Sequence, residues 1–101
     1  MVNKIINLRV FQDNQDKMNL SINDIKGEVL IVSQFTLYGD TTKGNRPSFI
    51  DSANKDIAFP IYKEFIKIMR KKVEVVETGK FASKMEVELI NDGPITLIIN
   101  I

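Results

Sequence analysis

The sequence predicts an α+β domain with mostly antiparallel, barrel-like β structure and one long helix. Two observations favour this class: short apolar segments with strand character alternate with turn-rich segments, and residues 56–72 carry apolar side chains at helical spacing. The chain has 101 residues, of which 44% are hydrophobic and 27% charged. This composition is typical of a folded protein, and the absence of a repeat or linker predicts a single domain over residues 1–101.

The N-terminal third is expected to form a hairpin. Residues 4–11 have the pattern of a helix end that continues into a strand, and the polar stretch 12–17 is typical of a turn. Residues 18–20 would form the returning strand. The β-branched run over residues 29–32 then favours a strand that is buried on both faces.

A long loop and a helix follow. Residues 39–54 are rich in Gly, Asp, Thr, Asn and Ser, and a loop of this length is usually functional or mobile. The helix is predicted over residues 56–72, with Asp56 as its N-cap, which would place Pro60 near the first turn, where a missing N–H costs little.

The C-terminal third reads as three strands. A first strand is predicted over residues 73–76. Residues 85–90 alternate apolar and acidic side chains, which predicts a strand with one wet face, and the turn at 91–94 leads into a nearly all-apolar strand over 95–101.

Histidine and cysteine are both absent. The chain therefore cannot run a Ser-His-Asp or Cys-His relay, and it lacks the commonest metal ligand and all thiol chemistry. An enzyme built from this sequence would work with hydroxyls, amides, carboxylates, lysines, backbone N–H groups or the substrate itself. We therefore expect no metal and no cofactor.

The charge distribution is uneven although the net charge is only +1. Residues 43–84 hold ten Lys/Arg and five Asp/Glu, whereas both flanking regions are slightly acidic. A basic middle fits an anionic partner, and a solvated lysine-rich helix face explains it equally well. No apolar run reaches the roughly 18 residues of a membrane helix and no secretory signal is present, so a cytoplasmic protein without a membrane partner is expected.

Two polar stretches stand where the apolar pattern should simply continue or end. The first is SQFT at residues 33–36, and the second is NDGPIT at residues 91–96. An ordinary strand end, with polar groups bonded to neighbouring backbone, explains the first as well as a functional role does. An ordinary hairpin turn explains the second.

Taken with the segments between them, these stretches resemble the D-aminoacyl-tRNA deacylase family. The motifs SQFTLYGD, KGNRPSF, F-x-x-x-M and NDGPITLIIN occur in the family's order, and the resemblance covers residues 4–101. It implies the deacylase-like fold in an N-terminally shortened form, because members usually begin with a hairpin and most of a helix before the KIINLR segment. A fragment, a shortened product or a misplaced start would account for this difference.

The resemblance implies hydrolysis of D-aminoacyl-tRNA and of mischarged glycyl-tRNA by a homodimer with its active site at the subunit interface. The catalytic strand end would be Ser33, Gln34, Phe35 and Thr36, with Leu37 completing the motif. Gly93 and Pro94, joined by a cis peptide bond, would enter from the other subunit and select the D enantiomer. A chiral pocket of this kind excludes the L form without contacting the side chain.

Hydrolysis without imidazole needs a positioned water and a stabilised oxyanion, because the aminoacyl ester is already activated. The backbone N–H groups of Phe35 and Thr36 are the candidate donors. Assistance by the ribose 2′-OH is favoured over a nucleophilic Thr36 hydroxyl, which has no base beside it, and it restricts the substrate to RNA rather than DNA.

The resemblance also implies residues that bind the tRNA. Phe81 matches the family phenylalanine that stacks on the terminal adenine, and Met85 would line the same pocket. Both could instead be core residues, and for Met85 the core role is favoured. The sequence reads Ala82 where the family more usually has glycine. Lys43 and Arg46, in the long loop, are weak candidates for phosphate contacts.

Three other interpretations remain open. A threonyl-tRNA synthetase editing module of the same fold would hydrolyse an L-seryl ester. A non-catalytic RNA-binding or interaction domain would keep the basic middle without needing the two polar motifs. An inactive fragment would expose an unpaired sheet edge and the apolar side chains beside it.

Overall fold

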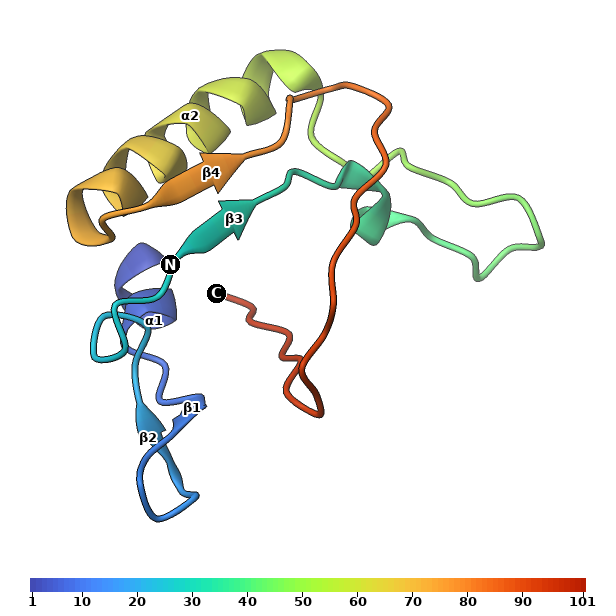
Figure 1. The fold of residues 1–101 in the computed structure, drawn as a ribbon. Coiled ribbons are helices and arrows are strands. Elements are labelled where there is room, and N and C mark those ends of the chain that lie inside the picture. Colours follow the sequence, from blue (N-terminus) through green and yellow to red (C-terminus); the bar gives the residue numbers. More distant parts are fainter.

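The chain folds into two small sheets and one long helix in a computed structural model that describes residues 1–101. A short helix, α1 (Val2–Ile6), precedes the first sheet, and the second sheet packs beneath α2 (Lys55–Lys72) (Figure 1). The expectation of a fold that mixes helix and sheet, with one long helix, is therefore confirmed in its coarse form. No helix is long and apolar enough to cross a membrane.

The predicted N-terminal hairpin is present. Strand β1 (Phe11–Gln12) pairs antiparallel with β2 (Met18–Leu20). The turn between them is organised by Asp13, whose carboxylate accepts hydrogen bonds from the N–H groups of Gln15 at 2.8 Å and Lys17 at 3.0 Å. Its second oxygen accepts from the Asn19 side chain at 2.8 Å. These bonds, the one from Asn19 foremost, hold the pKa of Asp13 below its ordinary value.

This turn gives a pH-dependent prediction. Because the pKa of Asp13 is lower in the folded chain than in the unfolded one, its stabilisation is complete above the unfolded pKa, near 3.8, and is lost as the pH falls through the folded value. We expect Asp13→Ala to lower the urea midpoint slightly at pH 7, with the difference from the parent shrinking below pH 3.8. Asn14→Ala is the matched control in the same turn. If it lowered the urea midpoint as much as Asp13→Ala at both pH values, the assignment to Asp13 would be contradicted.

The second sheet corrects the expectation of mostly antiparallel strands. Strand β3 (Val29–Ile31) pairs in parallel with β4 (Val76–Thr78), in the register Val29 to Val76 and Ile31 to Thr78. The connection between them contains α2, and a helical crossover returns the chain to the sheet in its original direction. The strand predicted over residues 73–76 is instead observed at Val76–Thr78.

The expectation that residues 29–32 are buried on both faces is also wrong. Leu30, at the centre of β3, is 57% exposed. Val29 and Ile31 pack against the core, whereas Leu30, between them, points to the other face of the sheet, which is left exposed.

Helix α2 begins one residue earlier than expected. Its N-cap is Asn54, whose side-chain oxygen accepts a hydrogen bond from the Ile57 N–H at 3.1 Å, so Asp56 is not the cap but an acidic residue of the first turn. Pro60 consequently lies inside the helix rather than near its start. Three basic residues in the last turn complement the helix dipole.

The buried core is small and lies between α1, α2 and the parallel sheet. It comprises only Val2, Ile6, Met69, Val73 and Val76. The accessible surface is 8845 Å², compared with roughly 5,800 Å² expected for a compact monomer of this mass. The radius of gyration, 15.9 Å, likewise exceeds the approximately 13 Å typical of 100 residues. A single chain therefore leaves much of its apolar surface uncovered.

The C-terminal segment contributes most clearly to this open surface. Residues 85–90 and 95–101, both predicted to be strands, form no ladder, and the segment runs outside the two sheets (Figure 1). Ile90, Ile98 and Ile101 are 97%, 89% and 90% exposed. Apolar alternation specifies which face of a strand would be buried, but a strand also needs a neighbouring edge for its N–H and C=O groups. A barrel-like arrangement is accordingly not formed within one chain.

Candidate functional site

The SQFT stretch forms a tight turn directly after β3. Gln34 is extended, with φ −149° and ψ 92°, and the 3₁₀ helix η1 (Phe35–Tyr38) follows. The N–H of Gly39 donates to the Thr36 carbonyl at 3.0 Å and closes the turn. The Gln34 side-chain amide donates to the Thr36 hydroxyl. Ser33 is half-buried, whereas the next three residues are exposed to solvent.

The start of η1 presents backbone donors. The first N–H groups of a helix have no acceptor within the helix, and Phe35 and Thr36 are the first two residues of η1. Two neighbouring N–H groups at an exposed turn can stabilise a developing negative charge on oxygen. Phe35 and Thr36, whose N–H groups are the candidate oxyanion donors, are thus the first two residues of one short, exposed element.

The long loop supports η1 through an aromatic contact. The rings of Phe35 and Phe49 meet edge to face, with centroids 5.3 Å apart and an interplanar angle of 70°. A backbone bridge between Asp40 and Ser48, with N···O distances of 2.8 and 2.9 Å, holds Phe49 in place. A Cβ added to Gly39 would lie 2.9 Å from the Phe49 ring and 3.0 Å from the Thr36 carbonyl oxygen. Gly39 and Phe49 were not identified from the sequence because nothing in the local pattern reveals this approach.

At the start of the same loop, Asp40 accepts a hydrogen bond from the Thr42 N–H at 2.9 Å, which lowers the pKa of its carboxyl group. Lys43 and Arg46, the candidate phosphate contacts, are exposed further along the loop. No group of three or more His, Cys, Asp or Glu side chains lies close enough to hold a metal ion.

The Gly93–Pro94 peptide bond is cis, and both residues are exposed. The turn is bridged by a hydrogen bond from the Asn91 side chain to the Thr96 hydroxyl at 3.5 Å. The side-chain hydrogen bonds of the two polar motifs are internal to each, joining Gln34 to Thr36 and Asn91 to Thr96. Within one chain, no hydrogen bond connects the Gly93–Pro94 turn to η1.

Phe81 belongs to an aromatic cluster on α2. Its ring centroid lies 5.0 Å from that of Phe59 and 5.2 Å from that of Tyr62. The Tyr62 hydroxyl donates to the Ile31 carbonyl at 3.4 Å, which ties the cluster to β3. An open hollow of about 410 Å³ lies beside it, lined by Lys55, Asp56, Phe59, Pro60 and Phe81.

Met85 does not line this hollow. Its sulfur lies 3.1 Å from the position that a Cβ on Gly79 would take, and Val32 is close to the same point. The structure therefore separates the two residues that the sequence suggested for one pocket. The structure also brings Phe59 and Tyr62 against Phe81. Their spacing of three residues could have indicated that they share one face of the helix.

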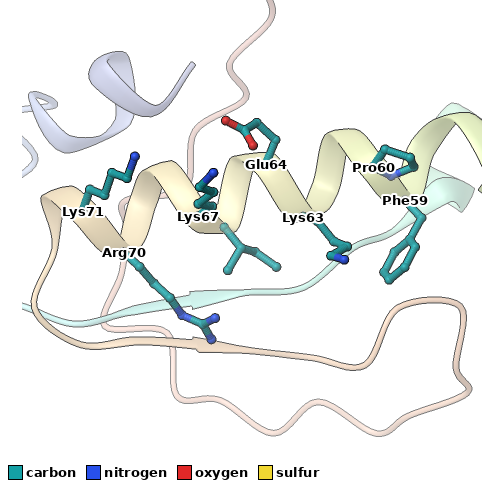
Figure 2. Close-up of a pocket in the computed structure, with 8 residues that line it drawn as sticks. Phe59, Pro60, Lys63, Glu64, Lys67, Arg70 and Lys71 are labelled. Atoms are coloured by element: carbon teal, nitrogen blue, oxygen red, sulfur yellow. The ribbon is translucent and has the colours of Figure 1, made fainter.

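A basic surface continues from this hollow along α2. Phe59 and Pro60 also border a second, larger groove of about 830 Å³. Its charged lining consists of Lys63, Glu64, Lys67, Arg70 and Lys71, which follow successive turns of the helix (Figure 2). The Lys63 ammonium group lies 5.5 Å from the centroid of the Phe59 ring.

These features define a small mixed α/β protein whose exposed polar chemistry is carried by backbone groups, hydroxyls and amides beside an aromatic and basic helix surface. The chain belongs to the D-Tyr-tRNA(Tyr) deacylase family, whose model matches residues 1–100. A D-aminoacyl-tRNA deacylase of Thermosipho melanesiensis is 55% identical over 101 residues, which are 99% of this chain and 67% of that protein. One from Geobacillus sp. is 57% identical over 99 residues, covering 98% of this chain and 65% of its own length.

A solved structure has a similar fold. The protein described as c-Myc DNA Unwinding Element Binding Protein is 42% identical, with a TM-score of 0.84 over 94% of this chain and 65% of that one. The chain thus spans about two thirds of the length of the relatives it matches.

Proposed function

We propose that this chain hydrolyses the ester bond of D-aminoacyl-tRNA, and of mischarged glycyl-tRNA, releasing the free amino acid and tRNA as a chiral proofreading step in translation. The observation that carries the proposal is the exposed SQFT turn, where the N–H groups of Phe35 and Thr36 begin η1 in a member of a deacylase family. Water attacks the ester carbonyl, the bond to the ribose oxygen breaks, and the proton passes to that oxygen. The two N–H groups stabilise the intermediate oxyanion.

In this proposal a group of the substrate, and not a side chain of the protein, assists removal of the proton from the attacking water. The sequence contains no imidazole, and the Thr36 hydroxyl already accepts a hydrogen bond from the Gln34 amide, which is not a base. The vicinal 2′-OH of the terminal ribose is the remaining group within reach of the ester. This assignment explains why the substrate would be RNA and not DNA.

Selection of the D enantiomer is assigned to Gly93 and Pro94. Both are exposed, and a Cβ on Gly93 would meet only the Asn91 amide, at 3.8 Å, so the backbone there is open to close approach. Backbone carbonyls at this turn would accept hydrogen bonds from the substrate ammonium group. Because the turn has no hydrogen bond to η1 of its own chain, we assign it to the active site of a second copy.

A homodimer is supported by the uncovered surface. The excess of about 3,000 Å² over a compact monomer is larger than the roughly 800 Å² that each partner buries in a standard interface. It includes the apolar segment that follows β4, with Leu89, Ile90 and Ile98 at 68%, 97% and 89% exposure. Light scattering should give twice the chain mass of 11.5 kDa.

The terminal adenosine would enter the hollow beside Phe81. Phe81 and Phe59 offer aromatic surface there, and stacking of one base on such a surface contributes about 1–3 kcal/mol. Met85 packs against Gly79 instead, so in this proposal it supports the segment that carries Phe81.

The test compares D-Tyr-tRNA with L-Tyr-tRNA as substrates and follows loss of the ester. We expect rapid loss of the D ester and no acceleration for the L ester over its spontaneous rate. Faster hydrolysis of an L-seryl-tRNA ester than of D-Tyr-tRNA would identify a threonyl-tRNA synthetase-type editing module. Binding of tRNA without hydrolysis would identify a non-catalytic RNA-binding domain.

The assignment of Thr36 gives a mutational prediction. Thr36→Ala should retain activity within about tenfold, because the backbone N–H survives and only the hydroxyl bonded to Gln34 is lost. Single-turnover kinetics on D-Tyr-tRNA measure this, with Thr36→Ser as the control. A loss beyond about a thousandfold, with a trapped acyl-enzyme in the parent, would identify the hydroxyl as a nucleophile.

Chelation gives a second prediction. The sequence offers neither histidine nor cysteine, the usual ligands of a catalytic zinc, and the hydrolysis proposed here uses only backbone N–H groups and the substrate. Activity after dialysis against EDTA should equal that of untreated protein. Loss of activity that added zinc restores would refute this mechanism.

A further inference from the structure

We infer that the outward face of α2 formed by Lys63, Lys67, Arg70 and Lys71, here called the α2 basic face, binds phosphates of the tRNA acceptor strand adjoining its terminal adenosine. The inference rests on the proposed function and extends it from the terminal nucleotide to the strand behind it. Its basis is one continuous surface, because Phe59 and Pro60 border both the hollow beside Phe81 and the basic groove.

The charge on this face is strongly one-sided. Four cations and one carboxylate, Glu64, line the groove. A helix surface that serves only solubility commonly intersperses charges of both signs. Here the excess positive charge follows consecutive turns (Figure 2). Such a stripe is complementary to a phosphate backbone.

The dimensions also fit. At 1.5 Å per residue, the stripe from Lys63 to Lys71 is about 12 Å long. A stripe of this length can contact several consecutive phosphates of one nucleic-acid strand. Lys63 begins the stripe beside the aromatic hollow, where its ammonium group lies over the Phe59 ring.

The face is held rigidly by the other side of the same helix. Met69 is 1% exposed, and Phe65 and Ile68 pack against the core, so α2 cannot turn its basic side inward. A fixed array of cations positions a bound strand without reading its sequence. Lys63, Lys67, Arg70 and Lys71 would therefore strengthen tRNA binding equally for different tRNAs.

The test neutralises three residues far from the hollow. Lys67→Gln/Arg70→Gln/Lys71→Gln keeps good helix formers in α2, and the control Lys4→Gln/Lys17→Gln/Lys26→Gln removes the same charge from exposed sites outside α2. Binding is measured by fluorescence anisotropy of labelled deacylated tRNA at several salt concentrations. At low salt, the α2 triple variant should bind about tenfold more weakly than the parent, or weaker still. The slope of log K against log salt should fall by about two. The control should stay within about twofold of the parent.

Kinetics supply the second readout. For D-Tyr-tRNA, kcat/KM of the α2 triple variant should fall by about the same factor as the binding constant. For D-tyrosyl-adenosine, which carries the ester on one nucleoside, kcat/KM should not change. Equal losses on both substrates, an equal effect in the control, or unchanged tRNA affinity would each overturn the inference.

If circular dichroism shows that the triple variant is unfolded, Lys67→Gln and Arg70→Gln are measured singly, and each should weaken tRNA binding several-fold. Failure of the proposed function looks different. In that case the parent protein leaves both esters intact, while the binding comparison between the two triple variants still decides the role of α2.

Discussion

Gly39→Ala is expected to lower kcat for D-Tyr-tRNA by about a hundredfold while changing global stability little. The backbone of Gly39, with φ −64° and ψ 126°, is accessible to alanine, so the obstacle is contact and not backbone strain. A Cβ there would lie 3.0 Å from the Thr36 carbonyl oxygen and 2.9 Å from the Phe49 ring. The Thr36 carbonyl is backbone and can yield only if η1 moves. Displacing one oxyanion donor typically costs about 10²–10³ in rate.

The two contacts can be separated experimentally. In Gly39→Ala/Phe49→Ala the ring is gone but the Thr36 carbonyl remains, so we expect at most partial recovery of kcat. Gly27→Ala is the control, because its Cβ would meet only the flexible Ile22 and Ile25 side chains, at 3.0 Å and beyond. Full activity in Gly39→Ala would contradict the prediction that this contact controls the position of the η1 N–H groups.

Local patterns predicted those parts of the fold that local interactions decide. The helix follows from apolar spacing, although it begins one residue earlier than predicted and its cap is Asn54 in place of Asp56. The hairpin follows from a polar turn whose Asp13 bonds its own neighbours. Such features depend on contacts within a few residues, which a sequence displays directly.

Features that depend on distant contacts were predicted less well. The strand run 29–32 does not reveal that β4 joins it in parallel, because the direction of pairing is set by the crossover through α2. The sequence over 85–90 and 95–101 has the apolar alternation of strands, but neither segment pairs with a strand of the same chain. In our proposal the second copy provides the missing cover, and that information is not contained in a local pattern.

The candidate site divides in the same way. The SQFT and Gly–Pro motifs were found from the sequence because polar residues interrupt an apolar pattern, and their assigned roles stay predictions. The setting of Phe81 between Phe59 and Tyr62, and the closeness of Gly39 to Thr36, come from tertiary packing. Met85 lies against Gly79 and not in the hollow beside Phe81, because spacing along the chain does not specify the direction of a side chain.

Met69→Ala should have the largest effect on stability. Met69 is 1% exposed and is one of only five buried residues, at the point where α2 covers α1 and the parallel sheet. Truncating a buried methionine to alanine typically costs about 2–5 kcal/mol. A small domain has a total stability on the order of 5–15 kcal/mol. The change therefore removes a substantial share of the free energy of unfolding, and partial unfolding at 37 °C is expected.

The measurement is urea unfolding followed by circular dichroism at fixed protein concentration, because any self-association would make the midpoint depend on concentration. Ile50→Ala is the control: Ile50 is 87% exposed in the long loop, and its truncation should change stability by no more than about 0.5 kcal/mol. Equal losses in the two variants would mean that the fold is stabilised mainly elsewhere. Since α2 also carries the aromatic cluster and the α2 basic face, Met69→Ala should weaken tRNA binding at temperatures where its unfolded fraction rises, whereas Ile50→Ala should not.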